Sequence, residues 1–145
     1  MGAGIVGAMT GQRLKELPGW MESWGSFRAR NPDGLVMDQP DWARSYGRNP
    51  YVGYDSLARP FLSDGEMPPY GIEPLARIVH VGNRAWPLQR VAEAGGLTEA
   101  GVTIDWTAGQ ASALDAGQIA KGRDIGNIRV RDAATGRDLA HDVMF

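Results

Sequence analysis

The sequence contains no cysteine, which excludes disulfide bonds, thiolate nucleophiles and any zinc or iron–sulfur site built on cysteine. It also lacks the run of about 18 apolar residues that a membrane-spanning helix requires. Its glycine-rich start has neither the basic stretch nor the apolar stretch of a signal peptide. We therefore expect no membrane span, and without a targeting signal in these residues the compartment stays unknown.

The sequence has no strong excess of charge of either sign. Lys and Arg number 15, Asp and Glu number 17, and the formal net charge is -2. A surface without a broad positive field does not attract phosphate groups, so we expect no nucleic-acid partner. Histidine is scarce as well, because His80 and His141 are the only two, and their spacing fits no pattern of metal ligands. We expect neither a metal nor a cofactor.

One motif argues at first sight for a nucleotide. Gly2, Gly4 and Gly7 have the Gly-x-Gly-x-x-Gly spacing of a dinucleotide-binding loop. Such a loop follows a buried strand and opens a helix, whereas here only one residue precedes the motif and Pro18 interrupts the stretch that follows. We attribute the match to glycine content and predict a strand or loop with close backbone approaches.

Glycine and proline are abundant, with 20 and 9 residues respectively. Both interrupt helices and mark turns, so short strands joined by turns are expected. The length of 145 residues fits one domain with one core. The predicted fold class is α+β over residues 1–145, mainly antiparallel β hairpins with one or two short helices and a long ordered loop rich in Tyr, Gly and Pro.

Short local patterns place the expected elements along the chain. Gly82 and Asn83 suit a two-residue hairpin turn, and Ser23 can cap a short helix. Apolar and polar residues alternate over 102–107, as in a strand with one buried face. The predicted elements are helices from Ser23 and over 88–94, a turn at 31–34 followed by a strand over 35–37, a strand over 102–107, and hairpins over 76–88 and 125–145.

The centre of the predicted long loop, residues 46–55, gathers aromatic, guanidinium, amide and carboxylate groups. One interpretation is a polar and aromatic pocket for a sugar, a carboxylate or a peptide. The other is structural: Arg48 stacks on a tyrosine ring and pairs with Asp55, while the phenols cap loop carbonyls. The candidate ligand-binding residues are Tyr46, Arg48, Asn49, Tyr51, Tyr54 and Asp55.

The two histidines are each predicted to lie in a strand. His141 shares one face of its strand with apolar residues such as Val143, which favours a buried core histidine. Either ring could still meet an aspartate in space and act as a general base or a metal ligand. The candidate partners are Asp55, Asp105 and Asp115. Ser112 lacks the flanking glycines of a nucleophile elbow, so we interpret it as structural.

Four stretches occur in a characteristic order: SWGSFRARNPDG, YGRNPYVGYD, ARIVHVGNRAWPL and GQASALD. In this order and at these spacings they resemble the later part of an uncharacterised bacterial family, domain of unknown function 3179, over nearly all of residues 2–145. The resemblance implies that the chain is the C-terminal portion of a larger family domain, whose missing N-terminal half carries a Cys-Pro-x-Cys-Gly stretch. It also implies relatives that are often exported, and it implies no activity.

We predict a non-enzymatic domain, structural or ligand-binding, centred on the 46–55 loop. The alternative is a hydrolase or metal-dependent enzyme that uses His80 or His141 with aspartates, and a histidine lining an open pocket beside two carboxylates would favour it. Trp42 or Trp86 could offer a platform for a sugar ring. We also expect self-association through unpaired edge strands, because the last predicted strand runs to Phe145.

Overall fold

The computed structural model describes residues 2–15, 17–61 and 65–144. Within them, two short α-helices and two antiparallel sheets of three strands confirm the α+β class. The helices are α1 (Trp24–Arg30) and α2 (Leu88–Glu93), and the strands are β1 (Ile78–Val81), β2 (Arg84–Pro87), β3 (Leu97–Glu99), β4 (Val102–Thr107), β5 (Asn127–Asp132) and β6 (Asp142–Met144). No helix among the described residues is long and apolar enough to cross a bilayer.

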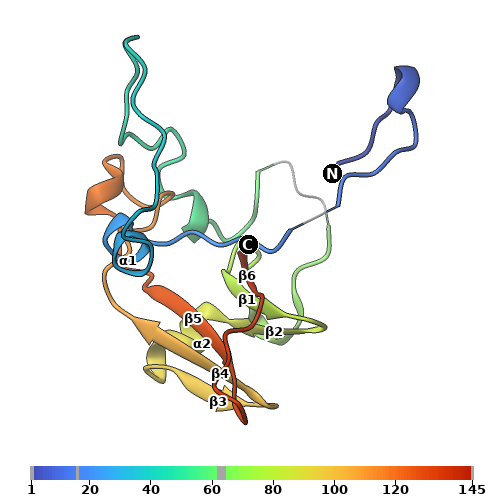
Figure 1. Ribbon diagram of the computed structural model, residues 1–145, viewed down its shortest axis with the longest axis vertical. Helices are drawn as coiled ribbons and strands as arrows, with labels where there is room; N and C mark the ends of the chain where they lie inside the picture. The colour runs from blue at the N-terminus through green and yellow to red at the C-terminus, as the bar shows by residue number, and fades with distance from the viewer. Residues whose placement is uncertain (1, 16, 62–64, 145) are drawn as a thin grey trace.

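The strand order is β2-β1-β6 in one sheet and β3-β4-β5 in the other, and both sheets lie together in the lower part of Figure 1. The β1–β2 hairpin turns at Gly82, which has a φ of 62°. Glycine adopts this angle without strain because it has no Cβ. Helix α2 follows at once and ends before Gly95, which has a φ of 67°. These features confirm the predicted hairpin over 76–88, the helix after it and the strand over 102–107.

A single core joins the two sheets. Helix α2 contacts β2 in one sheet and β4 in the other, so its buried face closes the space between them. Fully buried side chains such as Ile104 and Val91 contribute about 1.5–3 kcal/mol each to folding. The buried apolar residues are Val79, Trp86, Leu88, Val91, Val102, Ile104 and Val130. All of them come from the second half of the chain.

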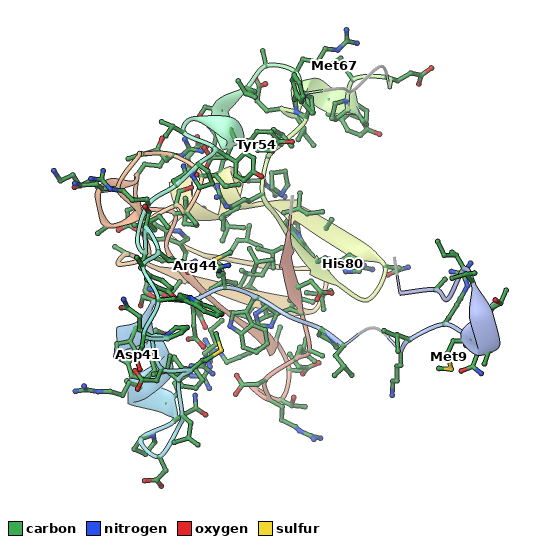
Figure 2. All side chains as sticks on the ribbon, turned by 90° about the horizontal axis from the view of Figure 1, so that it is seen from above. Met9, Asp41, Arg44, Tyr54, Met67 and His80 are labelled. Carbon is green, nitrogen blue, oxygen red and sulfur yellow. The ribbon has the colours of Figure 1, made fainter. Side chains whose placement is uncertain are left out.

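The first half packs loosely around this body. The exposed large apolar residues of the described ranges all fall between Ile5 and Tyr70. Residues 2–14 form a small hairpin that projects from the body (Figure 1), and Met9 marks its tip in Figure 2. A Cβ on Gly4 would lie 2.1 Å from the carbonyl oxygen of Met9. Of the glycines in the apparent nucleotide motif, Gly4 therefore serves a close backbone approach within this hairpin.

Helix α1 begins as the sequence predicts, because the Ser23 side chain accepts a hydrogen bond from the Ser26 amide. The turn after it also forms, with the Gly34 amide donating to the Asn31 carbonyl at 2.9 Å. The predicted strand over 35–37 is wrong: Leu35, Val36 and Met37 are 93%, 69% and 92% exposed and pair with no strand in the described ranges. A strand needs a partner edge, and the chain leaves the turn away from both sheets.

The predicted hairpin over 125–145 is correct only near its turn. Arg131 pairs with Asp138, and the Leu139 amide donates to the Val130 carbonyl. The chain then leaves β5, and β6 pairs with β1 in the other sheet. Further back along β5, the Asn127 side chain accepts from the Ser23 amide at 2.9 Å. Phe145, predicted to end this arm, lies outside the described residues.

Candidate functional site

The 46–55 loop is anchored along its length to the loop formed by residues 110–121. The Asn49 amide donates to Gly117 at 3.0 Å, the Gly53 amide to Asp115 at 2.8 Å, and the Ile119 amide to Gly47 at 2.9 Å. Backbone groups that lack a regular ladder thus find backbone partners in the second loop. The two loops form one layer beside the sheets.

Asp55 lies at the end of this anchored stretch with its side chain 0% exposed. Ser112 Oγ donates to Asp55 Oδ2 at 2.5 Å, Arg77 Nη1 donates to the same oxygen at 2.7 Å, and Arg123 Nη2 lies 3.0 Å from it. We call these four residues the Asp55 cluster. It connects the 46–55 loop, the stretch before β1 and both ends of the 110–123 region.

The charge of Asp55 is stabilised by its neighbours. Burial raises the pKa of Asp55. Hydrogen bonds from Ser112 and Arg77, together with the positive charges of Arg123 and Arg77, lower this pKa by more than burial raises it. The pKa therefore lies below the ordinary value of 3.8, and the carboxylate is ionised at neutral pH. A buried carboxylate held in this way acts as a structural anchor for the two arginines.

Ser112 is fully buried and fully engaged. Besides donating to Asp55, its Oγ accepts from Arg77 Nη2 at 2.8 Å and from the Leu114 amide at 3.2 Å. A Cβ on Gly122 would lie 2.3 Å from the Ser112 carbonyl oxygen, so the two backbones touch only because that residue is glycine. This geometry gives Ser112 the structural role that its sequence context indicated.

The six predicted loop residues differ in burial. Asn49 and Asp55 are buried, whereas Tyr46 and Tyr51 are exposed, and Tyr51 meets Tyr54 edge-on at 6.0 Å between ring centroids. Arg48 pairs through its backbone with Gln118. The predicted pairing of Arg48 with Asp55 is wrong.

The partners of Asp55 are instead Arg77 and Arg123, which lie 22 and 68 residues further along the chain. Arg123 also donates to Ser56 Oγ at 2.6 Å and to Asp115 Oδ1 at 3.3 Å. Sequence reasoning missed both arginines because nothing in their local context distinguishes them from other surface cations. Only the approach of the two loops selects them.

The two histidines have different surroundings. His80 Nδ1 lies 3.5 Å from Asp142 Oδ2 at a partly exposed position on β1, well away from Tyr54 in Figure 2. His141 is 6% exposed, stacks on Trp20 with ring centroids 4.5 Å apart, and has Nδ1 3.0 Å from the Leu139 carbonyl oxygen. Among the described residues, no group of three or more His, Cys, Asp or Glu is placed to hold a metal ion.

A groove of about 750 Å³ lies over β4 and β5. The register pairs Asp105 with Arg129 and Thr107 with Asn127, so these side chains share the polar face of the sheet and form the floor. The walls come from the segment around α1 and from the stretch between β5 and β6. They include Trp20, Ser26, Arg30, Asp138 and His141.

The charges in this groove are paired within the protein. Arg131 donates to both oxygens of Asp105 at 2.9 Å, and Arg129 donates to those of Asp138 at 2.8 and 3.2 Å. The hydrogen bond between Arg129 and Asp138 lowers the pKa of Asp138 and raises the pKa of Arg129. Arg30 pairs with Glu22 and lies over the Trp20 ring. The groove combines aromatic surface with compensated charge.

The predicted sugar platforms lie elsewhere. Trp86 is buried in the core, and its Nε1 donates to Glu99 at 3.1 Å. Trp42 is exposed beside Arg44, at 5.5 Å from the guanidinium carbon to the ring centroid. Neither tryptophan is among the described residues that line the groove. The tryptophans at the groove are Trp20 and Trp106.

The family described as "Protein of unknown function (DUF3179)" has a model that matches residues 1–142. The chain belongs to this family. No curated protein and no solved structure matches the chain. The description of DUF3179 names no activity.

Proposed function

We propose that this chain is a non-enzymatic ligand-binding domain in which the 46–55 loop has a structural role and the ligand lies in the groove over β4 and β5. The observation that carries the proposal is the groove of about 750 Å³, a volume typical of sites for small ligands. Its polar floor lies on paired strands, and a rigid floor holds ligand-binding groups in place.

The contacts of the 46–55 loop support the structural part of the proposal. The carboxylate of Asp55 is fully covered and holds two arginines and a serine. The backbone before it, at Asn49, Gly53 and Tyr54, donates to the 110–121 loop. Groups engaged in this way are not accessible to a ligand, and the exposed side chains that this loop could still offer to one include Tyr46, Arg48 and Tyr51.

One observation favours the enzymatic alternative. His141 lines the groove together with Asp105 and Asp138, which is the combination of a histidine and two carboxylates that a hydrolase would need. Each carboxylate, however, accepts two hydrogen bonds from an arginine. A carboxylate with a lowered pKa such as that of Asp138 is a weak general base at neutral pH. We therefore prefer binding to catalysis.

The proposal is tested by titrating the ¹⁵N-labelled chain with pools of neutral disaccharides, tripeptides and dicarboxylic acids. We expect one pool to shift the amide signals of Thr107, Asn127 and Arg129 at the groove floor. Shifts confined to Tyr46, Tyr51 and Tyr54 would place the ligand on the loop instead. Conversion of a pool member during the titration, abolished by His141→Ala, would support the enzyme.

We further propose that the chain self-associates through its edge strands. The outer edges of β2 and β3 end their sheets, and such edges pair with other chains unless they are protected. Light scattering after size exclusion should therefore show a concentration-dependent dimer, reduced by Thr98→Lys on β3. A monomer at every concentration would refute this.

A further inference from the structure

From the chemistry of the groove over β4 and β5 we infer that its ligand is a neutral polyhydroxylated ring compound, that is, a carbohydrate. This inference rests on the proposed function and names the ligand class for the same site. Three properties of the groove carry it: its compensated charge, its mixed donors and acceptors, and its aromatic wall.

Compensated charge excludes a strongly charged ligand. The arginines that line the groove each have a carboxylate partner: Arg129 holds Asp138, Arg131 holds Asp105 and Arg30 holds Glu22. A charged ligand would have to break one of these pairs to find a counter-ion, and it would leave the displaced partner without one. A neutral ligand requires no such exchange.

The pairs still have hydrogen-bonding capacity for a hydroxyl. A guanidinium carries five N–H donors, and a carboxylate accepts at about four lone-pair positions. The contacts of Arg131 with Asp105 use two bonds. Donors and acceptors therefore alternate across the floor at Asp105, Asn127 and Arg129. A sugar hydroxyl both donates and accepts, so it can bond to such a surface at each position.

The aromatic wall supplies a flat apolar surface. Trp20 lines the groove, is 39% exposed and stacks on His141 with an interplanar angle of 24°. The face of an aromatic ring carries partial negative charge, which attracts the C–H groups on the flat side of a sugar ring. The guanidinium of Arg30 also lies over this indole, at 5.9 Å from its centroid. A sugar would therefore pack on the part of the ring that His141 and Arg30 leave exposed.

His141 adds a specific acceptor. The Leu139 carbonyl can only accept, so the contact at 3.0 Å requires the proton on Nδ1. Nε2 is then an acceptor, and it is buried with no hydrogen-bond partner in the described part of the chain. A buried acceptor without a donor is unfavourable, and a ligand hydroxyl would satisfy it once the ring turns this nitrogen toward the groove. Because this ring stacks on Trp20, such binding also changes the environment of Trp20.

The experiment uses the full chain and calorimetric titration with a panel of neutral mono- and disaccharides of gluco, galacto and manno configuration. Glucuronic acid, glucosamine and trialanine serve as comparison ligands. We expect at least one neutral sugar to bind with a change in tryptophan fluorescence, and the charged sugars to bind about tenfold more weakly or not at all. Equal or tighter binding of a charged sugar would overturn the inference.

Variants locate the binding. Trp20→Ala, His141→Leu and Thr107→Val should each weaken binding of the sugar by about tenfold, the effect of one lost contact. Thr107 lies on a strand and tests the floor even if the first two variants fold poorly. Trp42→Ala removes an exposed tryptophan outside the groove and should leave affinity unchanged. A loss with Trp42→Ala alone would overturn the inference.

The panel also separates this inference from the proposed function. If trialanine, and no sugar, shifts the floor signals of Thr107 and Asn127, the ligand class is wrong while the groove remains the binding site. If no compound of either kind affects the groove, both proposals fail.

Discussion

Asp55 shows how much one buried carboxylate can hold together. It accepts from Ser112 and Arg77 and lies 3.0 Å from Arg123, and these residues come from separate stretches of the chain. Removing one partner of a buried ion pair leaves the other charge uncompensated, which costs more than the pair itself contributes. The cluster is therefore the most sensitive polar feature of the loop layer.

The variant Asp55→Asn should lower the free energy of unfolding by about 3 kcal/mol, because it leaves Arg77 and Arg123 beside a neutral amide. The matched control is Asp138→Asn, which also removes a carboxylate from an arginine but at an exposed site, where ion pairs contribute little. Urea unfolding of both variants measures the difference. Equal losses of unfolding free energy in the two variants would show that the burial of Asp55 does not increase its contribution to stability.

At this scale the sequence indicated some roles and missed others. His141 has the buried position expected of it, since apolar residues share its stretch of chain, and Ser112, interpreted as structural, is also buried. The pairing of Asp55 could not be predicted, because an arginine becomes its partner only through the approach of loops far apart in the chain. Arg48, the cation that the sequence suggested as its partner, pairs through its backbone with Gln118 instead.

Among the secondary-structure elements, β5 depends on one glycine, Gly126, at the point where the strand begins. Gly126 has a φ of 72°, and a Cβ there would lie 2.0 Å from Trp106 Nε1. That nitrogen donates to the Ile125 carbonyl at 3.0 Å. The indole thus packs directly on the backbone, and the entry into β5 leaves no space for a side chain.

Gly126→Ala should therefore destabilise the fold more than Gly136→Ala. Both glycines have positive φ, but no atom lies within 4 Å of the position for a Cβ on Gly136. We expect a loss of about 1–2 kcal/mol from backbone strain at either site, and a further loss of about 1–3 kcal/mol at Gly126 from the clash with Trp106. Thermal unfolding compares the two, and a shift in tryptophan emission in Gly126→Ala alone would identify the clash.

The elements with strong local signals formed as predicted, and those that depend on a distant partner did not. The β1–β2 hairpin and α2 follow from adjacent residues and a glycine turn. The last arm instead divides between two sheets: it pairs with β5 only near the turn, and β6 then pairs with β1.

For the whole molecule, several carboxylates are more acidic in the folded chain than in an unfolded one. The group that matters most is Asp55, because its side chain is fully covered. The pKa values of four more exposed groups are lowered in the same direction by hydrogen bonds: Glu99, Asp124, Asp132 and Asp138. All of them bind protons more readily once the chain unfolds.

Stability should consequently fall on acidification. A lowered folded pKa stabilises the fold fully above the unfolded value, and this contribution is lost as the pH falls toward the folded value. We expect the urea midpoint to be nearly constant between about pH 7 and pH 5 and to decrease from about pH 5 downward. Asp55→Asn should show a shallower decrease than the unsubstituted chain. A midpoint that rises on acidification would contradict this assignment.

The groove is also a property of the whole molecule. Its floor follows from the alternation of polar residues along β4 and β5, which the sequence displays. Its walls come from the stretch between β5 and β6, which follows the floor directly, and from Trp20 and α1, which lie far from the floor along the chain. No single stretch contains the site, so no motif could have revealed it.

By itself, the sequence determined the composition-level limits, the fold class, the family and the elements built from neighbouring residues, because these depend on short-range geometry and on which groups are present. The tertiary structure alone decided which arginines hold Asp55, which sheet receives the last strand and where a ligand could lie. Those outcomes depend on contacts between backbone edges and side chains that are far apart in the sequence. Such contacts leave no local pattern from which they could be predicted.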